Sequence, residues 1–165
     1  MRDPKFLLLL VVMLVFSFTE RAEASSTWRA PIDSPELVKE YRQPASDYSA
    51  GHRGVDYLVE EGQAVFAPAS AEVAFVGKVV NRGVITLKHG ATLITSLEPV
   101  CSEMEAGEKV LVGERIGAVC NASEYENHCK PRICLHFALR TDAGYLSPLV
   151  TIGGLAPSRL LPITP

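Results

Sequence analysis

Residues 51–59, Gly-His-Arg-Gly-Val-Asp-Tyr-Leu-Val, open a region in which short β-type runs follow one another. Glycine, proline or polar turns separate these runs, and no long stretch with a helical period of 3.6 residues interrupts them. The expected strands are Val55–Val59, Ala64–Ala67, Glu72–Val76, Val84–Lys88, Leu93–Leu97, Lys109–Val112, Arg115–Val119 and Ile133–Arg140. Many short strands at close spacing predict an all-β domain, a sandwich or barrel of antiparallel strands.

The segments that flank this region differ from it in composition. Residues 25–47 are rich in serine, proline and charge, which predicts an extended lead-in, although Ser34–Lys39 is compatible with one helical turn. Residues 151–165 contain a glycine pair followed by several prolines and predict an extended C-terminal strap. The expected single domain therefore spans residues 48–150.

The N-terminus has the pattern of a secretory signal peptide. Arg2 and Lys5 precede an apolar run from Phe6 to Phe18, and an Ala-x-Ala sequence ends at Ala24. The apolar run is shorter than the roughly 20 residues that a membrane-spanning helix needs. We therefore expect residues 1–24 to be removed and the mature protein to be secreted or associated with the cell wall.

The charge balance limits the possible partners. The net charge of −3 gives no basic surface for nucleic acid, and no polybasic segment favours a membrane surface after signal cleavage. We expect a monomer that binds neither.

The four cysteines, an even number in an exported chain, predict two disulfides. Four cysteines allow three pairings, which sequence does not distinguish. The pairing we favour joins Cys101 to Cys120 around a hairpin segment and Cys129 to Cys134 across a short loop.

Two pairs of residues are candidates for metal binding. His52 and Asp56 lie four apart, and Cys134 and His136 lie two apart, so on extended strands each pair shares one face. If the two faces meet, two imidazoles and a carboxylate converge and leave room for a water molecule. Three protein ligands and an open position are typical of catalytic zinc. A histidine beside apolar residues is, however, more often a packed or hydrogen-bonded core group.

The order of the motifs resembles the LytM/lysostaphin family of zinc metallopeptidases over about residues 46–150. The motifs that carry this resemblance are Gly51–Asp56, Gly62–Pro68, Val73–Gly77, Val84–Gly90, Gly107–Gly117, Cys134–Phe137 and Tyr145–Leu149. The resemblance implies antiparallel sheets that form a groove, in a duplicated hybrid-motif barrel-sandwich. It also implies that His52, Asp56 and His136 bind Zn²⁺ and that the substrate is a peptide cross-link of bacterial peptidoglycan.

The sequence departs from the family pattern at two positions. The family's last motif is His-x-His, whose first histidine acts on the substrate, and here Cys134 takes that position. A second family histidine, which helps handle the attacking water, is replaced by Glu98. Groups of this kind typically contribute about 10²–10⁴-fold each to the rate. We therefore expect weakened or altered catalysis.

Three interpretations of the altered pocket follow. In the first, Glu98 is the general base and the Cys129–Cys134 loop carries His128 toward the place of the missing imidazole. In the second, the fold binds peptidoglycan or regulates another hydrolase without cutting. In the third, Cys134 is a thiolate ligand that closes a structural zinc site.

Gly107–Gly117 also resembles the hammerhead strands of biotinyl and lipoyl carrier domains. Such domains present a modifiable lysine at a hairpin tip, and the surroundings of Lys88 do not fit that role. His89, beside a turn glycine, is interpreted as a strand-end residue.

Overall fold

The computed structural model describes residues 28–121 and 129–154. The predicted signal peptide and His128 lie outside these ranges, and the predicted C-terminal strap lies almost wholly outside them. Within them the fold is nearly all β, which confirms the predicted class, and the strands form no closed barrel. None of the helices in these ranges is long and apolar enough to cross a bilayer.

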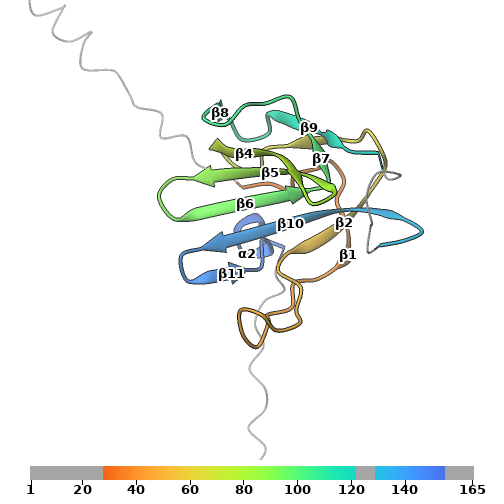
Figure 1. Ribbon diagram of the computed structural model, residues 1–165, viewed down its shortest axis with the longest axis vertical. Coiled ribbons are helices and arrows are strands. Elements are labelled where there is room, and N and C mark those ends of the chain that lie inside the picture. Colours follow the sequence, from red (N-terminus) through yellow and green to blue (C-terminus); the bar gives the residue numbers. More distant parts are fainter. Residues whose placement is uncertain (1–27, 122–128, 155–165) are drawn as a thin grey trace, which may run out of the picture.

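The strands form two antiparallel sheets (Figure 1). The larger sheet has the order β1-β2-β10-β6-β5-β4-β8, with β11 on β10, and the smaller sheet has the order β3-β9-β7. The elements are β1 (Glu36–Lys39), β2 (Val55–Val59), β3 (Ala64–Phe66), β4 (Ala71–Val79), β5 (Arg82–His89), β6 (Leu93–Glu98), β7 (Val100–Cys101), β8 (Lys109–Val110), β9 (Arg115–Val119), β10 (Ile133–Thr141), β11 (Gly144–Leu146) and the short helix α2 (Leu149–Ile152).

The core lies on one face of the larger sheet. Alternate residues of the central strands are buried there together with residues of the smaller sheet, because side chains on a strand point to opposite faces in turn. The buried set includes Val55, Tyr57, Ile85, Leu87, Leu97, Leu135, Phe137, Val65, Val100, Ile116 and Val119. The other face of the same strands is left for polar side chains.

The lead-in contributes a strand rather than a helical turn. Glu36–Lys39 forms β1, which pairs antiparallel with β2. The edge of β2 presents backbone N–H and C=O groups that need partners, and β1 supplies them. Farther back, Ile32 is almost fully buried in the core.

His89 ends β5, as interpreted from the sequence, and is buried at the base of the β5–β6 turn, where Gly90 adopts a φ of 67°. Its Nε2 lies 2.8 Å from the hydroxyl of the fully buried Thr95, and its Nδ1 lies 3.2 Å from the carbonyl of Ser70. The Trp28 ring packs against it, with centroids 4.6 Å apart. Burial lowers the pKa of His89 below 6.5, and the Ser70 carbonyl only partly offsets this effect.

His89 therefore predicts an acid-sensitive contribution to stability. Because the folded ring resists protonation more than the unfolded ring, its contribution is complete above about pH 6.5 and is lost as the pH falls below that value. In the variant His89→Gln, unfolding temperatures measured from about pH 8 down to about pH 5 should fall less than in wild type. An unchanged pH slope would contradict this assignment.

Candidate metal centre

Three side chains converge on one point of the larger sheet. The Nε2 atom of His52 lies 3.1 Å from Oδ1 of Asp56, and Nδ1 of His136 lies 2.8 Å from the same oxygen. The two imidazole rings have centroids 5.0 Å apart, and one ligand atom from each of the three residues lies within 4.8 Å of the others. The structure thus brings together the three residues that the sequence predicted as metal ligands.

The register of β10 on β2 produces most of this convergence. His136 is directly opposite Asp56, and its neighbours Leu135 and Phe137 are opposite Tyr57 and Val55. Residues directly opposite in an antiparallel pair point to the same face, so the apolar neighbours enter the core while His136 and Asp56 share the other face.

His52 reaches the site by a different route from the one expected. The sequence suggested one extended strand through His52 and Asp56, but the chain bends at Arg53 and Gly54 before β2 begins. His52 instead forms a two-way backbone bridge with Arg42, with N···O distances of 3.0 and 2.9 Å. The bridge to the lead-in, and not strand alternation, therefore places this imidazole.

Gly54 makes the bend possible. A Cβ atom at this position would lie 2.5 Å from the carbonyl oxygen of Phe137 and 2.7 Å from Nε2 of His136. Such distances are not tolerated, so only glycine lets the bend pass beside the His136 ring. Gly54 is part of the motif Gly51–Asp56, but nothing in the sequence alone indicates this close approach.

The orientation of the His52 ring is set by the lead-in. Its Nδ1 lies 2.7 Å from the carbonyl oxygen of Glu40, so this nitrogen donates a proton and Nε2 keeps its lone pair toward Asp56. Burial lowers the pKa of His52, more than the Glu40 carbonyl and Asp56 raise it, which favours the neutral ring. A neutral imidazole held by a backbone carbonyl is the usual form of a metal-ligating histidine.

The donor set fits zinc. Two imidazole nitrogens and one carboxylate oxygen are common zinc ligands, with bond lengths of about 2.0–2.2 Å. The side chain of Asp56 is fully buried and that of His52 is 10% exposed, whereas that of His136 is 17% exposed. The cluster is therefore mostly buried, and His136 is its most exposed member.

Glu98 lies next to this cluster but outside it. On β6 it is directly opposite His136, so a single row across three strands contains Asp56, His136 and Glu98. Its carboxylate accepts a hydrogen bond from Nη1 of Arg82 at 2.8 Å, and its side chain is 22% exposed. Arg82 is a site neighbour whose role sequence reasoning missed, because nothing in its spacing links it to Glu98.

The favoured disulfide pairing is confirmed. Cys101 is bonded to Cys120 and Cys129 to Cys134. The hypothesis that Cys134 is a thiolate ligand is therefore wrong for the oxidised protein, because its sulfur is in a covalent bond. Both sulfurs of the Cys129–Cys134 bond nevertheless lie within 4.8 Å of an Asp56 oxygen.

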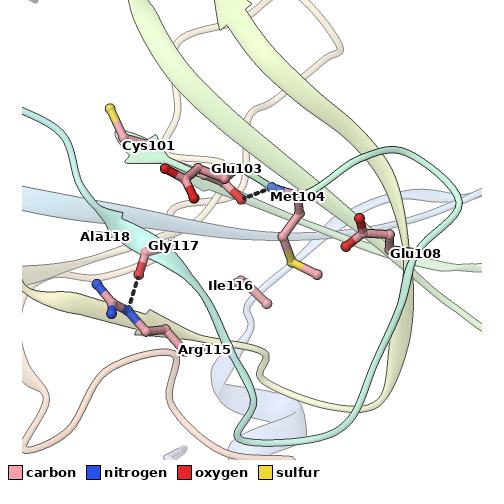
Figure 2. A pocket seen from close by; sticks show the side chains of 9 residues that line it. Cys101, Glu103, Met104, Glu108, Arg115, Ile116, Gly117 and Ala118 are labelled. Atoms are coloured by element: carbon pink, nitrogen blue, oxygen red, sulfur yellow. Dashed lines mark hydrogen bonds between the residues drawn. The ribbon is translucent and has the colours of Figure 1, made fainter.

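A cavity of about 650 Å³ lies elsewhere, against β7 and β9 of the smaller sheet (Figure 2). Its lining contains the charged residues Glu103, Glu108 and Arg115 above the buried Ile116, and none of the three clustered ligands. The Arg115 side chain is turned to the carbonyl of Gly117, at 3.3 Å. This cavity is separate from the candidate metal centre.

Known sequences match the region of the chain that contains the three clustered residues. The family model described as "Peptidase family M23" matches residues 50–148. The uncharacterized protein Rv2891 of Mycobacterium tuberculosis is 33% identical over 134 residues, which cover 79% of this chain and 52% of the relative. The chain thus spans about half the length of the curated relatives it matches.

Solved structures share the fold at low sequence identity. The antimicrobial peptidase lysostaphin from Staphylococcus simulans superposes with a TM-score of 0.64 at 17% identity, covering 86% of this chain and 61% of that chain. A zinc-containing peptidase from Vibrio cholerae superposes with a TM-score of 0.59 at 16% identity, covering 73% and 38% respectively. These likenesses confirm the arrangement of antiparallel sheets predicted from the sequence.

The close approach at Gly54 yields a prediction. Gly54→Ala should push the His136 ring aside and weaken zinc binding by about 10–100-fold, the usual cost of disturbing groups that orient metal ligands. Gly77→Ala is the matched control, since its new methyl group would meet only the exposed ring of Phe75. Equal zinc affinities of the two variants, measured by competition with a chelator, would refute the role of Gly54.

Proposed function

Because the chain belongs to peptidase family M23, we propose that it is a zinc metalloendopeptidase that acts on the cross-link peptides of bacterial peptidoglycan. The observation that carries this proposal is the meeting of His52, Asp56 and His136 around one point, with His136 the most exposed of the three. Zinc bound there supplies a Lewis acid for the scissile carbonyl and lowers the pKa of its water.

Each of the three proposed ligand residues has a different role in binding the ion. Asp56, the fully buried member, supplies negative charge at the centre, and the two imidazoles complete the set. The Glu40 carbonyl keeps His52 in the tautomer whose Nε2 faces the ion. His136 sits at the exposed margin, so the substrate approaches along the side shared with Glu98.

Glu98 is the proposed general base. A carboxylate is a competent base beside zinc, as in enzymes with the His-Glu-x-x-His motif. In this role Glu98 accepts a proton from the attacking water and delivers it to the nitrogen of the departing amine. The guanidinium of Arg82 donates a hydrogen bond to one oxygen of the carboxylate, and in this proposal the other oxygen serves for proton transfer.

His128 is proposed as the second polar group of the reaction. It precedes Cys129 in the chain, and the disulfide ties Cys129 to the strand that carries His136. We propose that the disulfide loop carries His128 toward the place of the missing family imidazole. There it would donate a hydrogen bond to the oxygen that gains charge in the transition state. Its removal should lower kcat without lowering zinc content.

The proposed location is outside the cytoplasm, secreted or at the cell wall, where peptidoglycan lies. The pattern of a signal peptide in residues 1–24 and the two disulfides support this location.

One observation favours a second candidate function, a non-catalytic module that binds peptidoglycan or regulates another hydrolase. Where the family's His-x-His motif supplies an imidazole, Cys134 is buried and held in a disulfide, so it cannot take over proton transfer. The row formed by Asp56, His136 and Glu98 would then bind peptide without cutting it.

The ligand assignment predicts the metal content of variants. The purified wild-type protein should contain about one zinc per chain, and His52→Ala or His136→Ala should abolish it because too few ligands remain. The histidine control is His89→Gln, which should keep its zinc since His89 bonds only Thr95 and Ser70 among the contacts described. Full zinc content in the His52 and His136 variants, by atomic absorption, would refute the site.

Digestion of purified sacculi separates the two candidate functions. If Glu98 is the base, Glu98→Gln should reduce release of peptide fragments by about 10²–10⁴-fold and leave zinc content unchanged. Glu103→Gln, at the separate cavity, is the matched control and should digest normally. Zinc-loaded wild-type protein that sediments with sacculi but releases no fragments would establish the non-catalytic module instead.

A further inference from the structure

Asp56 belongs to two groups of potential metal ligands. Besides the cluster with His52 and His136, its carboxylate lies within 4.8 Å of the sulfurs of Cys129 and Cys134. Among the residues that the structure describes, these two groups are the ones whose His, Cys, Asp and Glu atoms gather closely enough for a metal ion. The second group differs from the first in that its sulfurs are bonded to each other.

Cys134 and the ligands share one face of the sheet. On β10 it is two residues before His136, and on β2 its partner Leu58 is two residues after Asp56. Alternation along both strands therefore directs the Cys134 side chain to the face that carries His136 and Asp56. Cys101–Cys120, by contrast, joins β7 to the end of β9 and belongs to neither group of potential ligands.

From these observations we propose that Cys134 is a conditional fourth ligand of the metal centre, available only when the Cys129–Cys134 disulfide is reduced. The inference rests on the proposed zinc site. A zinc–sulfur bond is about 2.3 Å and a zinc–oxygen bond about 2.0–2.2 Å, so in a tetrahedral shell the two ligand atoms lie about 3.6 Å apart. The sulfur of Cys134 lies within 4.8 Å of an Asp56 oxygen. Ligation therefore requires a rotation of the Cys134 side chain, which becomes possible once the bond to Cys129 is broken.

The exposure of the two sulfurs sets the direction of the exchange. Cys134 is 2% exposed, whereas Cys129 is half-buried, so an external thiolate attacks the sulfur of Cys129. The disulfide breaks, Cys134 leaves as a thiolate, and Cys129 is held in a mixed disulfide. A second thiol of the same dithiol reductant then releases Cys129, so that the reductant loses two electrons and becomes a disulfide.

The fourth ligand changes what the site can do. With the disulfide intact, three protein ligands leave one position for water and substrate. With Cys134 bound, four protein ligands fill a tetrahedral shell, as in structural zinc sites. The oxidised protein therefore has the open centre, and reduction converts the same ion to a closed one.

Cobalt(II) provides a direct probe of this ligand change, because thiolate ligation adds a sulfur-to-cobalt charge-transfer band in the near ultraviolet. The oxidised full-length protein loaded with cobalt should show visible d–d bands alone. Addition of tris(2-carboxyethyl)phosphine should make the charge-transfer band appear; this reductant converts the disulfide and a water molecule to two thiols and the phosphine oxide, and it adds no competing thiolate. The double variant Cys101→Ser/Cys120→Ser should respond like wild type, and its two titratable thiols confirm that the second disulfide has been reduced.

Two single variants separate the cysteines. Cys129→Ser should show the band without reductant, because Cys134 is then always a thiol, and Cys134→Ser should never show it. If Cys129→Ser does not fold, the reduced wild-type protein, checked by its near-ultraviolet circular dichroism, carries the same test.

The inference is overturned if, after the thiols of Cys129 and Cys134 have been freed, the d–d bands persist but no charge-transfer band appears. The proposed metal centre itself fails if the oxidised protein shows no d–d bands at all. Slower loss of zinc to a chelator after reduction would support the fourth ligand independently, and unchanged or faster loss would count against it.

Discussion

The register between β2, β10 and β6 is the constraint on which the candidate site depends. It places Asp56, His136 and Glu98 in one row across three strands. A slip by one residue would turn every side chain of a strand to the opposite face. Phe137 and Leu135, fully buried on either side of His136, oppose such a slip, because it would expose both and bury the imidazole. The packing of the core thus specifies the geometry of the polar face.

The remaining ligand depends on a different kind of interaction. His52 is placed by backbone hydrogen bonds to Arg42 and oriented by the carbonyl of Glu40, both in the lead-in before the domain's first core strand. Gly54 lets the chain turn beside His136 without a clash. The lead-in is therefore part of the site, since without it one imidazole would lose both its position and its tautomer.

The two positions at which the sequence is expected to depart from the family pattern differ in their place: Glu98 lies in this row, whereas Cys134 lies beside it, opposite Leu58. Glu98 lies opposite His136 on β6 and pairs with Arg82, while Cys134 is bonded to Cys129 beside Asp56. In the proposed function, a carboxylate and a disulfide sulfur stand where the family pattern inferred from the sequence has two imidazoles. Under the proposed function Glu98 can transfer protons, whereas Cys134 can bind metal only after its disulfide has been reduced.

Much of the fold was predictable because it rests on local patterns. The alternation of apolar residues in runs such as Val55–Val59 and Ile133–Arg140 indicated strands and their buried faces, and motif order indicated His52, Asp56 and His136 as a set. β1 was missed as a strand because its exposed residues carry no alternation and its pairing depends on the free edge of β2.

Only the tertiary structure decided how the chemical groups meet. Three features join residues that are on separate segments: the bridge between His52 and Arg42, the pairing of Arg82 with Glu98, and the approach of the disulfide sulfurs to within 4.8 Å of Asp56. A sequence specifies which side chains each strand presents through short-range periodicity, which acts over a few residues. Distances between atoms on different strands arise from register and backbone hydrogen bonding across the sheet, which no local pattern encodes.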